Sequence, residues 1–494
     1  MNSLIDMKAK SAKQFEVFKV SSSLFRLPVL KILVLIFLSL YGCTRQEKTA
    51  CQIIGTLRVS TDNPRYFADS TGKIVYLTGS HTWTNLVDAG PGYPPGRFDF
   101  DKYLDWLEAY NHNFIRLWTW DMLTWHSGNY NPDNILSIYP HPYARTGPGE
   151  ATDGKPKFDL FRFDDEYFAR LRERIEKAGK RGIYVSVMLF EGWSMQFATD
   201  GWKNHFFNPM NNINGVNGDI NNDGVGLEIY TLADSTITGL QERYTKHVID
   251  VVNEFDNVLF EISNENHPPS TEWQYHLIDF IHKYEMQKSK QHPVGMTFQY
   301  RGGSNETLFL SPAEWISPNS IVENKDVRNN PPAATGKKVI LYDTDHIGGI
   351  WGNQPWVWKT FLRGMNPLFM DTYNGIFIPN PPETDWDPVR RSMGYTRDYA
   401  NRVNLVMTIP HDELSSTGFC LAYPGKVYIV YQEVPDSAFK VTTQKGRYYY
   451  EWFNPMAGTV FNSGKIKLRD GLMDFKAPFY GDAVLYLKRI SPFF

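Results

Sequence analysis

The chain has 494 residues, of which 42% are hydrophobic and 15% aromatic, enough to bury a core of two or three domains or of one barrel with an appendage. Its 51 Lys and Arg against 54 Asp and Glu give a formal net charge of -3, and basic residues are concentrated only at the N-terminus. This balance excludes nucleic acid as the expected partner. A neutral or weakly charged ligand fits better, and the 14 Trp, 28 Tyr and 32 Phe are of the residue types on which sugar rings stack.

The N-terminus has the pattern of a bacterial export signal. Basic residues up to Lys31 precede the apolar run ILVLIFLSLYGC, which ends at Cys43. A run of about ten residues is too short to span a bilayer, and Gly42 before Cys43 resembles the lipobox of bacterial lipoproteins. We expect residues 1–43 to be a signal peptide, cleaved before Cys43, whose thiol is then lipidated and anchors the protein to the membrane, at the outer membrane or cell surface or in the periplasm. A plain signal peptide with an incidental Cys43 is the alternative.

Two further cysteines, Cys51 and Cys420, either pair or stay free in an oxidising compartment. The spacing of Cys and His residues matches no metal-binding pattern, so no catalytic metal is expected.

Short apolar strands then alternate with longer segments of helical periodicity, which favours a (β/α)8 barrel over residues 55–404. The hairpin-like segment 55–77 is expected to close the bottom of this barrel. Eight strands are predicted, at 74–80, 113–120, 183–190, 257–264, 293–299, 316–324, 338–343 and 367–373. Helices with a one-sided apolar stripe are predicted at 164–181, 238–255 and 272–287. A doubly wound sheet would also alternate, but no Gly-rich phosphate-binding turn follows the first strand.

From residue 405 the pattern changes to short alternating strands without long helices, which predicts a C-terminal β-sandwich over 405–494.

Acidic residues follow the fourth and seventh predicted strands. Asn264 and Glu265 follow VLFEIS, and KVILYDTDH ends the seventh strand with Asp343 and Asp345. Hydrolysis of a glycosidic bond needs one acid to protonate the leaving oxygen and a second carboxylate across the sugar. Because barrel strands bring their C-terminal ends to one mouth, Glu265 is the expected acid, and Asp343 or Asp345 the second carboxylate, with Asp343 favoured by its strand position.

Several segments resemble a known family: YFADSTGKIVYLTGSHTW, NFIRLWTWD, VLFEISNEN, YEWFNPMAGTV and DAVLYL. They are similar to bacterial apiosidase-like glycoside hydrolases, in which a sandwich labelled a putative collagen-binding domain follows the barrel. The resemblance covers most of residues 55–494 and extends to the wider clan of retaining barrel glycosidases with an Asn-Glu motif. It implies that Glu265 is the acid/base, that Asn264 contacts the hydroxyl next to the anomeric carbon, and that Arg116 steadies the nucleophile.

The clan has Glu where this chain has Asp343, and the shorter side chain leaves both retaining and inverting chemistry open. Glu261, four residues before Glu265, is expected inside the barrel as a structural partner. The other strand ends supply candidate substrate-binding residues, each of which could equally be a packed barrel residue: His81, Trp83, Trp118, Trp120, Asp121, Glu191, Tyr300, His346 and Asp371.

The run GDINNDGVGLE places Asp219, Asn221 and Asp223 at the spacing of a calcium loop, but Tyr230 stands at the twelfth position, where such loops have Glu, and Glu228 falls two residues early. An Asx-rich turn is the alternative to calcium.

The sequence therefore predicts a glycoside hydrolase with a carbohydrate substrate and no redox cofactor. The competing hypothesis is a noncatalytic lipoprotein that binds glycan or matrix. Proteolysis has no support, because neither a His-Glu-x-x-His motif nor a nucleophile elbow is present.

Overall fold

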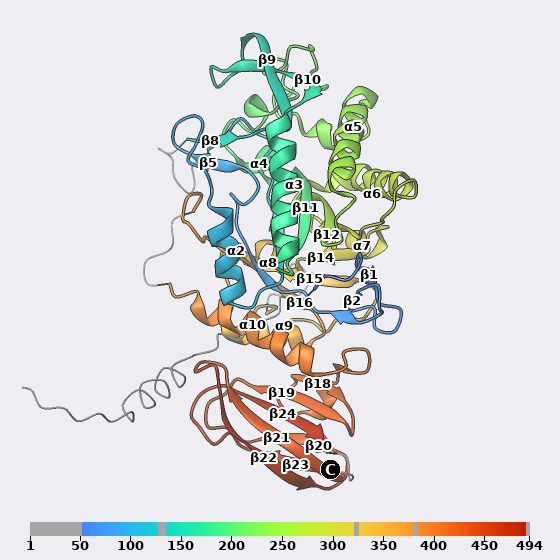
Figure 1. Cartoon of the computed structure of the whole chain (residues 1–494), viewed down its shortest axis with the longest axis vertical. Coiled ribbons are helices and arrows are strands. Elements are labelled where there is room, and N and C mark those ends of the chain that lie inside the picture. The colour runs from blue at the N-terminus through green and yellow to red at the C-terminus, as the bar shows by residue number, and fades with distance from the viewer. Residues whose placement is uncertain (1–51, 127–134, 321–325, 379–383, 491–494) are drawn as a thin grey trace, which may run out of the picture. The chain divides into compact units, whose positions relative to one another are not determined.

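The computed structural model describes residues 52–126, 135–320, 326–378 and 384–490 (Figure 1). The predicted signal peptide, Cys43 and Cys51 lie outside these residues, so export, lipidation and the pairing of Cys51 stay predictions. Cys420 is buried in the C-terminal sheets and has no disulfide partner among the described residues. Within the described ranges, no helix combines the length and the apolar character needed to cross a bilayer.

Eight parallel strands form the barrel that the sequence predicts. Their order in the sheet is β4 (Gly79–His81), β16 (Asn366–Met370), β15 (Val339–Asp343), β14 (Trp315–Ser317), β13 (Val294–Thr297), β12 (Val258–Asn264), β11 (Tyr184–Glu191) and β6 (Phe114–Leu117). The two ends of this order, β4 and β6, meet where the Asn113 N–H donates to the Thr78 carbonyl over 3.0 Å. Strands β11 and β12 are buried along their whole length, because helices cover the outside and side chains fill the inside.

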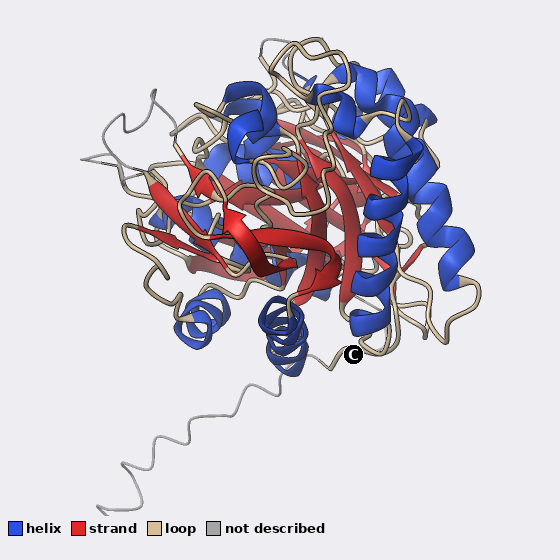
Figure 2. Ribbon diagram, turned by 90° about the horizontal axis from the view of Figure 1, so that it is seen from above, coloured by secondary structure: helices blue, strands red, loops and turns tan. Residues whose placement is uncertain are grey.

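Helices surround these strands, as the view from above shows (Figure 2). Three long ones match the predicted segments within one turn: α3 (Asp165–Lys180), α5 (Ser235–Val252) and α6 (Thr271–Glu285). Asp164 caps α3 by accepting a hydrogen bond from the Tyr167 N–H. The other α-helices in the described ranges are α2 (Phe100–Ala109), α4 (Trp193–Phe197), α7 (Asn305–Leu310), α8 (Thr344–Gly348), α9 (Gln354–Leu362) and α10 (Asp387–Arg402).

A small antiparallel sheet closes the N-terminal end of the barrel. It consists of β1 (Arg58–Val59), β2 (Phe67–Ala68) and β3 (Ile74–Val75). Leu57, Phe67 and Leu77 pack in one cluster with residues at the starts of the barrel strands, among them Leu259 and Val339. The predicted strand 74–80 is therefore divided: its first residues belong to this cap, and only its end enters the barrel.

Additional strands that the sequence did not predict follow the first two barrel strands. One antiparallel sheet contains β5 (Asp88–Gly90), β8 (Leu136–Tyr139) and β7 (Thr124–Trp125), and a hairpin contains β9 (Tyr143–Glu150) and β10 (Pro156–Phe163). Both lie between β4 and β11 in the chain, where loops of a barrel form the wall of the active-site mouth.

The C-terminal region contains two antiparallel sheets. The six-stranded sheet has the order β17 (Ile409–Pro410), β18 (Cys420–Tyr423), β19 (Val427–Gln432), β24 (Ala483–Arg489), β21 (Gly446–Asn454) and β22 (Thr459–Leu468), and the second sheet pairs β20 (Phe439–Thr443) with β23 (Gly471–Phe475). Apolar side chains of both sheets form one buried cluster, as a sandwich requires.

Helices α9 and α10 join the barrel to the sandwich (Figure 1). Trp358 of α9 stacks on Tyr431 of β19 with ring centroids 6.3 Å apart. Arg402 of α10 donates two hydrogen bonds of 2.8 Å to Glu451 of β21. The contact is therefore apolar at its centre and ionic at its edge.

Candidate active site

A cavity of about 490 Å³ opens at the C-terminal ends of the barrel strands. Three acidic side chains line it: Glu191 at the end of β11, Glu265 just after β12, and Asp345 in the first turn of α8. Asn264 and His346 line it beside them. The cavity therefore contains the kind of carboxyl groups that the sequence predicted at this end of the barrel.

Glu265 has an unusual backbone conformation that turns the chain out of β12. Its φ is 42°, in the left-handed region that non-glycine residues rarely adopt. Its N–H donates to Thr297 Oγ1 over 3.2 Å, and its carbonyl accepts from Gln196 Nε2 over 2.8 Å. The end of β13 and the short helix α4 thus hold the backbone of Glu265 in place, and its side chain lines the cavity.

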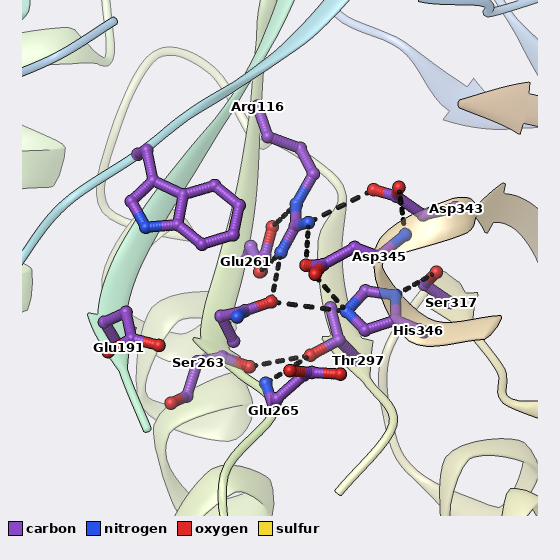
Figure 3. A network of polar contacts seen from close by, with 12 residues as sticks. Arg116, Glu191, Glu261, Ser263, Glu265, Thr297, Ser317, Asp343, Asp345 and His346 are labelled. Carbon is purple, nitrogen blue, oxygen red and sulfur yellow. Dashed lines mark hydrogen bonds and ion pairs between the residues drawn. The ribbon is translucent and has the colours of Figure 1, made fainter. Parts of the chain in front are cut away.

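Arg116, on β6, binds the acids beneath the cavity (Figure 3). Its Nε and Nη2 donate to the two carboxylate oxygens of Glu261 over 2.8 and 2.6 Å. Its Nη1 donates to Asp343 over 3.1 Å and to Asp345 over 2.9 Å. Nη2 also donates to Asn264 Oδ1 over 2.6 Å. All five N–H donors of the guanidinium are therefore occupied.

The two acids after β15 have different positions. Asp343 is fully buried and does not line the cavity, whereas Asp345 does. Asp343 binds His81 Nε2 at 2.8 Å, and its Oδ1 accepts the Asp345 N–H at 3.0 Å, which caps α8. The chain thus turns into a helix directly after the strand, and this turn carries Asp345 to the surface of the cavity.

The surroundings separate the pKa values of these acids. Burial, and next the charges of Asp345 and Glu191, raise the pKa of Glu265 well above its usual value. Burial also raises the pKa of Asp345 to about 6, with Arg116 opposing the shift and Asp343 adding to it. Burial alone would raise the pKa of Asp343, but His81 and Arg116 together lower it below its usual value. These surroundings favour the protonated form of Glu265, whereas Arg116 favours the ionised form of Asp345.

His346 orients the amide of Asn264. Its Nδ1 lies 2.7 Å from Ser317 Oγ and its Nε2 lies 3.2 Å from Asn264 Oδ1. Burial, and next the charge of Arg116, lower the pKa of His346 to about 3, so the ring is neutral. A neutral ring that accepts from Ser317 donates from Nε2 to Asn264. Arg116 and His346 thus both hold the Asn264 oxygen, which leaves its NH2 group to contact a ligand.

Glu191 is held at the end of β11 by backbone donors. Its two oxygens accept from the Trp193 and Ser194 N–H groups, each over 2.9 Å. Burial raises its pKa to about 7, and the hydrogen bonds from Ser194 oppose that shift. The following Gly192 permits close approach of the β12 end, because a Cβ there would lie 2.5 Å from the Asn266 side chain.

Aromatic side chains form one wall of the cavity. Trp83, Trp118 and Trp120, predicted from the strand ends, lie in this wall. Phe377 stacks on Trp120 with centroids 4.8 Å apart and an interplanar angle of 6°, and Trp125 packs on Phe377 at 4.7 Å. Tyr300, which is 40% exposed, also lines the cavity.

Other predicted residues lie outside the cavity wall. His81 stacks on Trp118 and binds Asp343. Asp121 accepts hydrogen bonds from the Glu191 N–H and from Tyr230 Oη, and thereby supports the end of β11. Asp371 forms a two-point ion pair with Arg390. Each of these therefore supports a neighbour rather than facing the cavity.

The sequence analysis did not single out several lining residues: Trp125, Asn319, Ile347, Gly348, Gly349, Ile350, Met370, Phe377 and Ile378. Most lie in loops or in the inserted sheet, where no strand end signals their position. The aromatic composition of GIFIP after strand eight is the one local signal for Phe377.

The predicted calcium loop brings its acids together. Carboxylate oxygens of Asp219, Asp223 and Glu228 lie within 4.8 Å of one another. Asn221 Nδ2 donates to both Asp223 and Glu228, and Asp219 accepts from the Gly224 N–H over 2.9 Å. The same contacts describe an Asx-rich turn, so calcium binding stays a prediction.

Comparison with known proteins places the fold. Residues 128–300 match a family model described as a domain of unknown function (DUF6298). Among curated proteins, none matches this sequence. The chain is similar to a solved glycoside hydrolase at 13% identity and a TM-score of 0.57, over 88% of this chain and 97% of that one.

Two solved proteins from Bacteroides vulgatus ATCC 8482 are similar over 88% of this chain. One is a putative glycoside hydrolase, at 13% identity with a TM-score of 0.56 over 82% of its length. The other is a glycoside hydrolase family 5 protein, at 13% identity with a TM-score of 0.55 over 94% of its length. The fold is that of barrel glycoside hydrolases. The apiosidase-like resemblance and the collagen-binding label stay predictions.

Proposed function

We propose that the protein is a glycoside hydrolase that cleaves a glycosidic linkage in a polysaccharide or glycan, with Glu265 as the general acid. The observation that carries this proposal is a pair of carboxyl groups in one cavity: Glu265, whose pKa is raised by burial and by neighbouring acids, and Asp345, which forms an ion pair with Arg116. Glycosidic cleavage needs this combination of acid and carboxylate. The glycosidase-like fold adds support.

In this mechanism, Glu265 protonates the oxygen of the departing sugar as the bond to the anomeric carbon breaks. Asp345 acts from the opposite side, either by attacking the anomeric carbon or by removing a proton from a water that attacks it. Arg116 keeps Asp345 in position, and Asn264 binds the neighbouring hydroxyl of the sugar. Proton NMR of the first anomer released distinguishes the retaining course from the inverting one.

The role of Glu265 is tested by Glu265→Gln, which keeps the shape of the side chain and removes its proton. We expect turnover of a natural glycan to fall about 10²- to 10⁴-fold, the usual contribution of a general acid. A 2,4-dinitrophenyl glycoside of the same sugar should lose much less in its bond-breaking step, because its leaving group departs without protonation.

Glu166→Gln is the matched control, since Glu166 is an exposed acid on α3 outside the cavity. Full activity of Glu265→Gln on a glycan with a poor leaving group would contradict the assignment. Glycan binding without any turnover by the native chain would favour the noncatalytic alternative.

We further propose that the protein is exported and anchored through a lipidated Cys43. The basic N-terminus, the short apolar run and the Gly42-Cys43 pair support this. Mass spectrometry of the mature N-terminus from the native host tests it, and loss of membrane association in Cys43→Ser is the expected result.

A further inference from the structure

Carboxyl groups predominate among the ionisable side chains that line the cavity. Among the described lining residues, the acids are Glu191, Glu265 and Asp345, and neither Lys nor Arg is present. The rest of the wall is aromatic, aliphatic or amide. A ligand in this cavity therefore meets carboxyl groups and uncharged surface.

The cation nearest to these acids cannot receive an anionic ligand. Arg116 is only 1% exposed, and Glu261, Asp343, Asp345 and Asn264 already occupy its five donors. A ligand carboxylate or sulfate could reach the guanidinium only by displacing one of these acids. Such a displacement would leave a buried carboxylate without its counter-charge, which is strongly unfavourable.

His346 supplies no positive charge either. Its two ring nitrogens are engaged by Ser317 and Asn264. Protonation at Nδ1 would remove the acceptor for the Ser317 hydroxyl and would place a second cation beside Arg116. The neutral ring is the form that this hydrogen-bond pattern requires.

We propose that the sugar bound in this cavity is neutral, and that the site rejects uronic acids and sulfated sugars. The inference rests on the proposed function and names the charge class of its substrate. A fixed anion beside Asp345 in a partly enclosed cavity loses hydration and gains repulsion, and no Lys or Arg among the described lining residues offsets either. The hydroxyls of a neutral sugar can donate to Asp345 and Glu191, and its C–H faces can lie on the Trp120 wall.

The experiment uses the full chain carrying Glu265→Gln, so that bound glycans are not consumed. A glycan array with neutral oligosaccharides and their uronic and sulfated counterparts is probed, and binding that a further Trp120→Ala change abolishes is assigned to the cavity. We expect only neutral glycans to show such binding. The native chain is then assayed on a neutral ligand and its uronic counterpart, with an expected kcat/KM ratio of at least about 100 in favour of the neutral one.

A matched variant tests the electrostatic cause. Glu191→Gln removes one cavity carboxylate and should reduce the discrimination against the uronic counterpart, whereas Glu166→Gln on the exposed face of α3 should leave it unchanged. Cavity-dependent binding of a uronic or sulfated glycan would overturn the inference, as would the absence of any cavity-dependent binding. Binding of neutral glycans without hydrolysis by the native chain would contradict the proposed reaction and leave the charge class in place.

Discussion

The ends of β12 and β15 bring acids to the same cavity in opposite electrostatic surroundings. At the β12 end, burial and neighbouring acids raise the pKa of Glu265. At the β15 end, Asp343 and Asp345 share the Nη1 group of Arg116, which opposes the effect of burial on both. The comparison indicates that burial and neighbouring charges, rather than strand position, set the direction in which the pKa of a carboxyl group moves.

Asp345→Asn should produce the largest effect. Removing the ionised carboxylate is expected to lower kcat/KM at least about 10³-fold, because the anomeric carbon then lacks its attacking or activating group. In contrast to Glu265→Gln, the loss should be equally severe on a 2,4-dinitrophenyl glycoside, since a better leaving group does not replace this carboxylate. Measuring both variants on both substrates separates the roles of the two strand ends.

Circular dichroism should show that Asp345→Asn remains folded, because Asn keeps the size and one acceptor of the side chain. If the activated substrate restored the turnover of Asp345→Asn as it does that of Glu265→Gln, the two ends would not have distinct roles.

Arg116→Met should act mainly on stability. It removes the shared cation and leaves Glu261 and Asp343, both fully buried, without their main donor. We expect the free energy of unfolding to fall by about 3–5 kcal/mol, the usual consequence of breaking a buried ion pair. Urea denaturation measures this change. Lys180→Met, at the exposed ion pair with Glu176, is the control and should cost clearly less.

Asp343→Asn should have an intermediate effect that reveals a positioning role. Asp343 caps α8 at Asp345 and shares Arg116 with it, so we expect activity to fall about 10- to 100-fold through misplacement of Asp345. The charge of Asp343 also raises the pKa of Asp345. Removing that charge lowers the pKa of Asp345, so the acidic limb of the kcat/KM profile should move to lower pH. An unchanged limb would mean that Asp343 acts through structure alone.

The sequence predicted the barrel because the features that define it are local. Short runs such as VLFEI, apolar apart from Glu261, are typical of strands buried on both faces, and the single apolar stripe of 164–181 is typical of a helix that covers them. The division of 74–80 between the cap and the barrel was missed. Both parts of this segment are largely apolar. They differ in their pairing, because the first part pairs with β2 in the cap and the last part pairs with β16 in the barrel.

The candidate site was predictable as a set of strand ends, but the contacts within it were not. Periodicity placed Asp343 and Asp345 on one face of a continuing strand. The chain instead enters α8 after Asp343, so Asp343 turns inward to His81 while Asp345 reaches the cavity. The turn forms because the Asp343 side chain accepts a hydrogen bond from the backbone N–H of Asp345. The alternation of side chains along a strand does not predict such a local contact. Phe377 was missed because a loop, and not a strand end, places it in the wall of the cavity.

Glu191→Gln should produce the smallest effect and sharpen the comparison at the β12 end. The negative charge of Glu191 is one cause of the raised pKa of Glu265. Without it the pKa of Glu265 falls, so Glu265 loses its proton at lower pH and the alkaline limb of kcat/KM moves down, while the acidic limb set by Asp345 moves less. One acceptor for the Trp193 and Ser194 N–H groups is also lost, which should lower the free energy of unfolding by about 1 kcal/mol. An alkaline limb that stays in place would show that burial and Asp345 alone keep Glu265 protonated.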